Sequence, residues 1–247
     1  MINKDALQYI VSLGEANIKE VQLECGVTEK FSDKPLYRLD PYIPRANAIK
    51  MRTLTSLVDY IKGNIDIMVP KMIIHVESPE KVSMYSALDV ERKRECLVEV
   101  VARVPEFNFD TFMDNERFCI NLQSKFLSDP ETDKDLVLKF AGTVENGTIA
   151  QYGDDGVTQR ATVKTGITSK EAAVVPNPVK LRPYRTFMEV EQPTSDFIFR
   201  MKEGRNGGVE CALFEADGGA WMIAATKAIK GYLEYELADI QQFTVIS

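Results

Sequence analysis

The chain has 247 residues, 45% of them hydrophobic and 27% charged, which is ordinary for a soluble globular protein. Its apolar runs are too short to cross a bilayer, and its first residues lack the basic and apolar blocks of a secretion signal. The net charge of −7 excludes a protein that coats duplex DNA with its whole surface. We therefore expect a cytoplasmic protein with no membrane partner.

Four cysteines lie far apart in the sequence: Cys25, Cys96, Cys119 and Cys211. A zinc site usually needs closely spaced pairs of ligands, because the chain must wrap a small tetrahedron. Only one histidine is present to join them. The sequence therefore predicts buried, reduced thiols, and neither a metal site nor another cofactor.

The N-terminal part alternates between predicted helices and extended chain. Residues 4–24 carry apolar side chains near helical spacing and predict an amphipathic helix that ends at Gly26. Residues 31–52 hold three prolines and should be extended or loop-like. A helix over residues 53–64 follows, with a threonine as its N-cap and four apolar residues toward the core: Leu54, Leu57, Val58 and Ile61.

The next elements are strands and then helices. Residues 71–77 and 81–87 flank Ser-Pro-Glu and predict a hairpin, and residues 96–104 predict a third strand. Residues 114–127 predict a helix that begins with an aspartate cap, and residues 135–144 predict a second, short helix.

The remainder is expected to be rich in strands, at residues 148–152, 157–165, 180–190, 197–202 and 210–216. An Asp-Gly turn over residues 153–156 joins the first two of these strands. Residues 168–178 look irregular. A final helix over residues 221–235 is expected to begin after Asp217 as its N-cap, with Trp221 as a core anchor.

A short pattern recurs in the two halves of the chain. Val76-Glu77-Ser78-Pro79 recurs as Val190-Glu191-Gln192-Pro193, and Glu95-Cys96 recurs as Glu210-Cys211, at offsets of 114 and 115 residues. Duplication and coincidence both explain so few matches. The predicted fold is α+β, with an antiparallel β-rich core and two similar strand–strand–strand–helix modules. The expected segments are residues 1–52, 53–145 and 146–247, with one compact domain as the alternative.

A basic and aromatic segment is the strongest electrostatic feature. Residues 30–62 carry seven basic and three acidic side chains, a local balance of +4. Single-stranded nucleic acid is held by such a combination, because bases stack on rings and phosphates pair with cations. The candidate nucleic-acid-binding residues are Phe31, Lys34, Tyr37, Arg38, Tyr42, Arg45, Lys50 and Arg52, with a second group of Arg182, Tyr184 and Arg185. The alternative is that these rings pack in a core while the charges are solvated.

No set of residues in the sequence predicts catalysis. His75 is the sole histidine and lies in an apolar strand, without a local nucleophile or orienting acid. Six carboxylates stand in turns or near the last strands: Asp154, Asp155, Glu189, Glu191, Glu215 and Asp217. Clustered carboxylates can hold Mg²⁺, but turn chemistry explains the Asp-Gly pairs without a metal. Asp217-Gly218-Gly219 lacks the lysine of a phosphate-binding P-loop. We assign no catalytic residue and expect a protein that is not an enzyme.

Several segments together resemble one family. They are residues 154–159, 175–179, 183–187, 190–193 and 212–221, with upstream support at residues 53–60 and 75–79. Read together, they are similar to the YfdQ-like family of phage and prophage proteins over roughly residues 50 to 233. The resemblance implies a viral gene that acts in a bacterial host cell, near DNA replication and recombination functions. It implies no mechanism, catalytic residue or cofactor.

The leading hypothesis is a non-enzymatic phage accessory protein in DNA metabolism that binds single-stranded DNA or a recombination protein. One alternative is an anti-defence protein that sequesters a host factor or a nucleotide signal. Another is a metal-dependent nuclease that uses acids such as Asp154 and Glu215. We also expect a homo-oligomer, because β-rich modules expose strand edges that proteins must cover.

Overall fold

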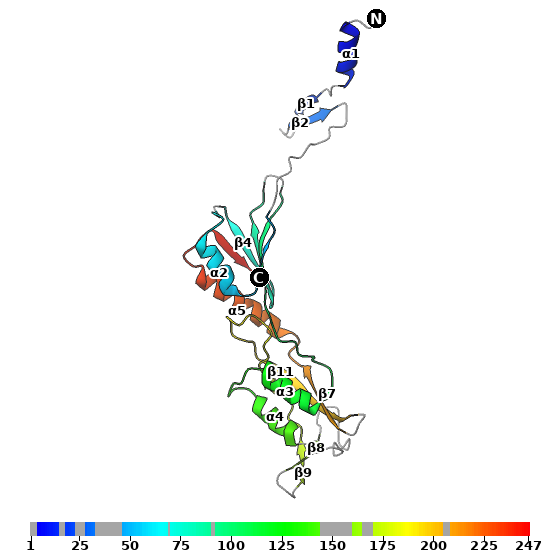
Figure 1. Cartoon of the computed structure of the whole chain (residues 1–247), viewed down its shortest axis with the longest axis vertical. Helices are drawn as coiled ribbons and strands as arrows, with labels where there is room; N and C mark the ends of the chain where they lie inside the picture. The colour runs from blue at the N-terminus through cyan, green and yellow to red at the C-terminus, as the bar shows by residue number, and fades with distance from the viewer. Residues whose placement is uncertain are drawn as a thin grey trace. The chain divides into compact units, whose positions relative to one another are not determined.

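The computed structural model describes residues 4–14, 18–22, 28–32, 46–68, 70–89, 92–143, 160–164, 170–204 and 208–247 (Figure 1). The chain divides into two compact units, Met1–Arg45 and Ala46–Ser247. Among the residues of these ranges, no helix is both long enough and apolar enough to cross a membrane.

The first unit contains a helix and a hairpin. Helix α1 (Lys4–Gly14) is followed by strands β1 (Ile18–Gln22) and β2 (Thr28–Ser32), which pair antiparallel. The prediction of one helix over residues 4–24 was therefore wrong beyond Gly14. Glycine is a poor helix former, and the pairing of β1 with β2 decides the conformation of the β-branched residues that follow. Every described side chain of α1 is exposed.

The second unit has two lobes, each with its own sheet. In the first lobe the strand order is β13-β4-β5-β6-β3, and helices α2 (Leu54–Gly63) and α5 (Ala220–Glu236) pack against this sheet (Figure 1). The central strands form an antiparallel meander, whereas β3 lies parallel to β6 and β13 lies parallel to β4. The strands are β3 (Ile49–Met51), β4 (Met72–Ser78), β5 (Lys81–Ser86), β6 (Cys96–Val101) and β13 (Phe243–Ile246).

The second lobe is an antiparallel sheet with two helices. Its strand order is β10-β11-β12-β7, and helices α3 (Asn115–Lys125) and α4 (Lys134–Thr143) pack against it. The strands are β7 (Met113–Asp114), β10 (Val179–Leu181), β11 (Ser195–Glu203) and β12 (Val209–Glu215). A separate hairpin consists of β8 (Arg160–Lys164) and β9 (Lys170–Val174). The α+β class with sheets rich in antiparallel pairs is confirmed.

Local signals place two helices as predicted. The hydroxyl of Thr53 accepts a hydrogen bond from the N–H of Ser56 at 3.2 Å and so caps α2, which ends at the left-handed residue Asn64. The four predicted core residues of α2 are all buried. Asp114 caps α3 by accepting from the N–H of Arg117 at 2.8 Å, and Phe118 and Leu122 are fully buried.

Two hydrophobic cores account for the lobes. The first contains strand residues such as Ile74 and Val98 together with Ile229 and Leu233 of α5. The second is rich in rings, and Phe118 stacks on Phe199 with 5.4 Å between ring centroids. Each core thus takes apolar faces from one sheet and two helices, the arrangement that hides a one-sided sheet from water.

The two lobes exchange helices. Helix α3 is the first helix after the meander of the first lobe, yet Phe118 belongs to the second core. Helix α5 follows the meander of the second lobe, yet Ile229 belongs to the first core. The first meander is followed by β7 and α3, which both belong to the second lobe, and the second meander is followed by α5, which packs on the sheet of the first lobe.

The buried Lys134 at the start of α4 closes the end of α3. Its ammonium group donates to the carbonyl of Phe126 at 2.6 Å and to the carbonyl of Gln123 at 3.1 Å. A cation there satisfies carbonyls that lack partners within the helix. Burial lowers the pKa of Lys134. Lys134 thereby fixes α4 against the C-terminal end of α3.

Three predictions for the second half were wrong. Strand β9 occupies residues expected to be irregular, because its pairing with β8 outweighs the weak strand preference of Lys, Glu and Ala. The strand expected over residues 180–190 ends at Leu181, and a long loop follows. The N-cap of α5 is Gly219, with φ of 81°, rather than Asp217. Residues with a Cβ rarely adopt this positive φ, so glycine is favoured there.

The predicted hairpin turn over residues 153–156, with the strand at residues 148–152, lies outside the described residues. So does Cys25. Of the other cysteines, Cys211 is buried while Cys96 and Cys119 are half-buried, and all three are free thiols. Burial raises the pKa of the Cys211 thiol, so this group is an inert part of the second core.

Candidate functional site

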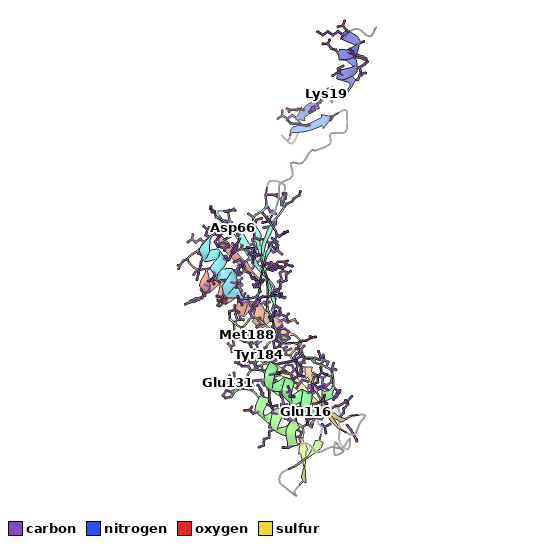
Figure 2. All side chains as sticks on the ribbon, in the orientation of Figure 1. Lys19, Asp66, Glu116, Glu131, Tyr184 and Met188 are labelled. Carbon is purple, nitrogen blue, oxygen red and sulfur yellow. The ribbon has the colours of Figure 1, made fainter. Side chains whose placement is uncertain are left out.

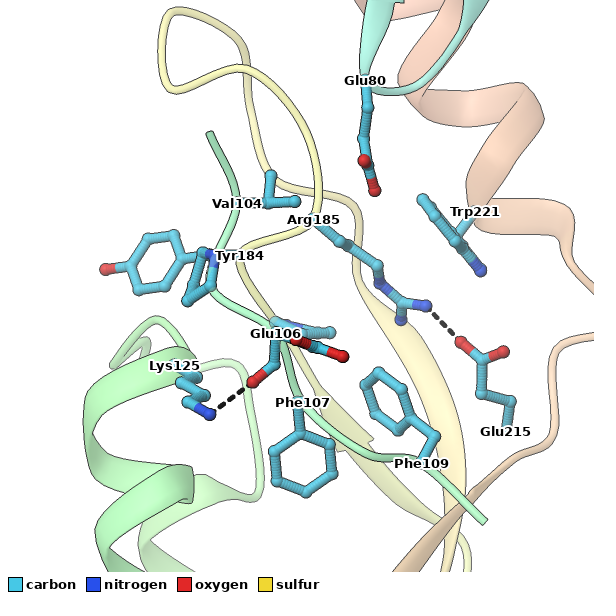
Figure 3. A pocket seen from close by; sticks show the side chains of 12 residues that line it. Glu80, Val104, Glu106, Phe107, Phe109, Lys125, Tyr184, Arg185, Glu215 and Trp221 are labelled. Carbon is cyan, nitrogen blue, oxygen red and sulfur yellow. Dashed lines mark hydrogen bonds and ion pairs between the residues drawn. The ribbon is translucent and has the colours of Figure 1, made fainter. Parts of the chain in front are cut away.

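A pocket of about 430 Å³ lies where the two lobes meet (Figure 3). Its walls come from the β4–β5 turn, the connection after β6, the end of α3, the loop after β10, the end of β12 and the first turn of α5. The lining residues are Glu80, Val104, Pro105, Glu106, Phe107, Phe109, Lys125, Pro183, Tyr184, Arg185, Glu215 and Trp221. This volume is in the range of small-molecule sites.

The loop over residues 182–194 forms one wall, and Gln192 holds it together. The side-chain oxygen of buried Gln192 accepts from the N–H of Arg185 at 3.0 Å and from the N–H of Thr186 at 3.2 Å. Its amide nitrogen donates to the carbonyl of Phe187 at 3.0 Å. Gln192 therefore satisfies buried backbone groups that no strand partner reaches.

Arg182 anchors the start of this loop to the second lobe. Its guanidinium pairs with Asp129 at 2.7 Å and with Glu191 at 3.5 Å, and its Nε donates to Thr194 at 2.9 Å. The N–H of Tyr184 donates to the carbonyl of Lys125 at 3.0 Å. Tyr184, which is labelled with Met188 in Figure 2, is thus held at a fixed place in the wall.

The same loop joins the first lobe. The buried hydroxyl of Thr186 donates to the carbonyl of Pro79 at 2.5 Å, in the β4–β5 turn. A carboxylate oxygen of Glu189 accepts from the N–H of Thr55 at 3.2 Å, in the first turn of α2. A carboxylate is favourable there, because the first N–H groups of a helix lack partners and carry positive partial charge.

Arg185 is the buried cation of the pocket. It is only 6% exposed, and its Nη1 pairs with Glu215 at 2.5 Å. Its guanidinium lies over the ring of Trp221 at 4.2 Å and over the ring of Phe197 at 5.3 Å. Burial lowers the pKa of Arg185, against the opposing effect of Glu215. Nε and Nη2 of Arg185 are buried and have no hydrogen-bond partner.

Aromatic rings make up much of the remaining wall. Phe107, Tyr184 and Trp221 are half-buried, so each ring presents part of its surface to the pocket. Phe107 packs against Phe109 and Phe126, with ring centroids 4.7 Å and 5.0 Å apart, which fixes its orientation. Half-buried rings in a pocket of this volume can stack on one planar ligand group.

The acidic residues proposed for a metal each have a structural role where the structure describes them. Glu189 caps α2, Glu191 pairs with Arg182 and Glu215 pairs with Arg185. Asp217 accepts from the N–H of Gly219 at 3.0 Å and so holds the turn into α5. Within the described ranges, no three His, Cys, Asp or Glu side chains come together in a group that could hold a metal ion.

The turn before α5 uses its free N–H groups internally. Burial opposes ionisation of Asp217, but nearby hydrogen-bond donors and the charge of Arg185 outweigh it and lower the pKa of this carboxyl. The carboxylate of Asp217 thus occupies the place where an external phosphate would meet the start of α5. The remaining metal candidates, Asp154 and Asp155, lie outside the described residues.

The structure separates the predicted nucleic-acid-binding residues. Tyr184 and Arg185 line the pocket, whereas Arg182 pairs with acids beside it. Lys50 in β3 and Arg52 just after it are exposed. Phe31 lies in β2 of the first unit, and five residues lie outside the described ranges: Lys34, Tyr37, Arg38, Tyr42 and Arg45.

Seven pocket residues received no functional role from sequence reasoning: Glu80, Val104, Pro105, Glu106, Phe107, Phe109 and Lys125. The spacing of Phe107 and Phe109 after Pro105 was the one available signal, an aromatic pair in a segment without helical or strand periodicity. Trp221, expected in a core, is half-buried in the pocket wall. His75 faces Ser83 and Ile246 in the first sheet and is not part of the pocket.

Comparison of the chain with protein-family models, with curated proteins and with solved structures gives no match. The similarity to the YfdQ-like family therefore remains a prediction from the sequence segments quoted above. Three of these segments, residues 183–187, 190–193 and 212–221, contribute to the pocket or hold its wall in place.

Proposed function

We propose that the chain is a non-enzymatic phage accessory protein of DNA metabolism that binds single-stranded DNA, with one base of the strand in the pocket between the lobes. One observation carries the proposal. Half-buried rings of Phe107, Tyr184 and Trp221 line a pocket of about 430 Å³ that also contains Arg185. Stacking of a base on such rings is worth about 1–3 kcal/mol and tolerates any sequence, since every base has a flat face.

The mixed charge of the pocket suggests that the base and the phosphates of the strand bind to different regions. Its lining includes the carboxylates Glu80, Glu106 and Glu215, against the cations Lys125 and Arg185. Such a pocket is suited to a base rather than to a row of phosphates. The backbone of the strand then depends on the basic residues 30–62, whose balance is +4. This region includes Arg38, Arg45, Lys50 and Arg52.

Binding to the pocket can be followed through its own chromophore. Trp221 is the single tryptophan of the chain, so its emission reports on the pocket wall. Labelled single strands should show increased anisotropy and alter Trp221 emission at the same concentrations. Tyr184→Ala should weaken binding by about 5-fold to 100-fold, from the loss of one stacking ring.

Tyr235→Ala is the matched control, because Tyr235 is 81% exposed on α5 and does not line the pocket. It should leave the affinity unchanged. Equal affinities of both variants and the wild type would exclude the pocket as the base site, and no binding at low salt would exclude the function.

The backbone contacts have a separate test in salt. Changing Arg38 and Arg45 to Ala should reduce the slope of log affinity against log salt by about 0.7 for each lost phosphate contact. Lys139→Ala with Lys227→Ala removes the same charge from exposed helix surfaces and should leave the slope unchanged. An unchanged slope in the arginine variant would locate the phosphate contacts elsewhere.

A further inference from the structure

We infer that the Nε–Nη2 edge of Arg185 is a phosphate-binding fork, which takes two oxygens of the phosphate attached to the nucleotide whose base occupies the pocket. The inference rests on the proposed function for the identity of the ligand. It adds the chemical group that Arg185 recognises.

Arg185 has hydrogen-bond donors that no acceptor meets. One nitrogen, Nη1, is taken by Glu215, while Nε and Nη2 are buried and unpartnered. A buried donor without an acceptor costs about 1–3 kcal/mol, and more when it is charged. Buried arginines usually have every donor paired, so the two free groups mark a place where an acceptor is missing.

The unpartnered edge of Arg185 has the shape of a two-pronged donor. Nε–H and Nη2–H point in parallel from one side of the guanidinium and match two oxygens of a single phosphate or carboxylate. The rings of Trp221 and Phe197 and the ion pair with Glu215 hold the plane of the guanidinium in place. The orientation of the fork is therefore fixed, and a phosphate binds it by displacing the neighbouring side chains that cover the two buried nitrogens.

The charge around Arg185 favours a nucleotide over a free anion. The guanidinium is already neutralised by Glu215, and Glu80 and Glu106 line the same pocket. Long-range attraction of a free anion is therefore weak. A phosphate is favoured there when a base that stacks on Tyr184 and Phe107 delivers it. This excludes inorganic phosphate as a tight ligand and favours a nucleotide, within a strand or alone.

The test uses the full chain and the emission of Trp221. A deoxynucleoside 5′-monophosphate and the corresponding deoxynucleoside are titrated separately, with inorganic phosphate as a third ligand. Hydrogen bonds to a charged group are worth about 1.5–3 kcal/mol. The nucleotide should therefore bind about 10-fold to 100-fold more tightly than the nucleoside, and inorganic phosphate should bind more weakly than the nucleotide.

Arg185→Lys keeps the charge but removes the fork, and it should reduce the nucleotide-to-nucleoside ratio to near one. Lys125→Ala is the control, because it removes a cation of the same pocket that has no two-pronged donor edge. This variant should retain most of the nucleotide-to-nucleoside affinity ratio. Equal binding of nucleotide and nucleoside to the wild type overturns the inference without reference to any variant.

The failures of the two proposals are distinguishable. Single strands that bind and alter Trp221 emission, together with a nucleotide-to-nucleoside ratio of one, keep the proposed function and overturn the fork. A high ratio with no binding of single strands keeps the fork and overturns the proposed function. In that case the protein sequesters a free nucleotide.

Discussion

Both lobes contain a meander of three antiparallel strands, but the meanders differ in the connection between their first two strands. In the first lobe, β4 and β5 are joined by the tight turn at Pro79 and Glu80. In the second lobe, β10 and β11 are joined by the loop over residues 182–194. Pro79 and Pro193, which match in the recurring pattern, each stand two residues before the next strand. An expanded loop in one lobe thus supplies a wall of the pocket and meets the other lobe's turn at Thr186.

The length of this connection determines whether a meander only forms a sheet or also links the two lobes. The short turn leaves the first lobe as a plain sheet with helices on one face. The long loop binds to both lobes, through Arg182 to the second and through Thr186 and Glu189 to the first. The exchanged helices α3 and α5 reinforce this connection. The first core needs Ile229 and Leu233 of α5, whereas the second core comes from one continuous stretch of the chain, residues 107–213.

The largest expected effect tests whether the lobes are separable. Phe199→Ala in the second core should cost about 3–5 kcal/mol, and Ile74→Ala in the first core about 2–5 kcal/mol. Both residues are fully buried. Because the helices are exchanged, each variant should shift one single transition, which urea denaturation followed by far-UV circular dichroism and by Trp221 emission would show as coincident curves. Two separated transitions would mean that the lobes unfold independently.

The next effect compares matching positions of the two connections. Gln192→Ala leaves two buried N–H groups without an acceptor and should lower the free energy of unfolding by about 2–4 kcal/mol. Its counterpart in the recurring pattern is Ser78, whose hydroxyl accepts one exposed N–H bond at 3.3 Å. Ser78→Ala should cost under about 0.5 kcal/mol. Equal losses, measured by urea denaturation, would contradict the structural role of the long loop.

The smallest effect concerns the turn that leads α5 back to the first lobe. An unfolded aspartate has a pKa near 3.9, and the pKa of Asp217 is lowered in the folded chain. The ionised carboxylate therefore contributes stability that is fully present above about pH 4 and is lost as the pH falls through the folded value. Asp217→Asn keeps an acceptor and removes the charge, so it should cost under about 1 kcal/mol at pH 6.

Thermal or urea unfolding between pH 6 and pH 2.5 checks this prediction. The gap between wild type and Asp217→Asn should narrow as the pH falls. Asp239→Asn, at an exposed position after α5, is the control that makes the same substitution outside this turn. A difference in stability between wild type and Asp217→Asn that widens on acidification would contradict a lowered pKa of Asp217.

Local rules predicted the local parts of this fold. Thr53, Asn64 and Asp114 act as caps because the interactions that define a cap lie within four residues. The hairpin of β4 and β5 followed from alternation and a turn. The predictions for strand β9 and for the loop after β10 were wrong, because the conformation of each depends on partners outside the segment. The partner of the strand is β8, and the partners of the loop are Gln192 and Pro79.

The pocket was predictable only in part. Tyr184 and Arg185 were selected for their chemistry, and both line it. Their partners Phe107, Lys125 and Trp221 come from three other segments of the chain, which only the exchange of helices brings together. The sequence pattern does not indicate which of these distant segments lie close together in the folded chain. The pairing of Arg182 and Arg185 with acids was hidden for the same reason.

The exchange of helices makes each half of the gene dependent on the other. A chain cut between α4 and β8 would yield one fragment that lacks α5 and β13 of the first lobe, and another that lacks β7, α3 and α4 of the second lobe. Each fragment keeps an apolar face that only its counterpart covers. When the two fragments are made separately and then mixed, they should associate, fold together and restore the pocket that contains Trp221. The chain is therefore suited to use as a split reporter.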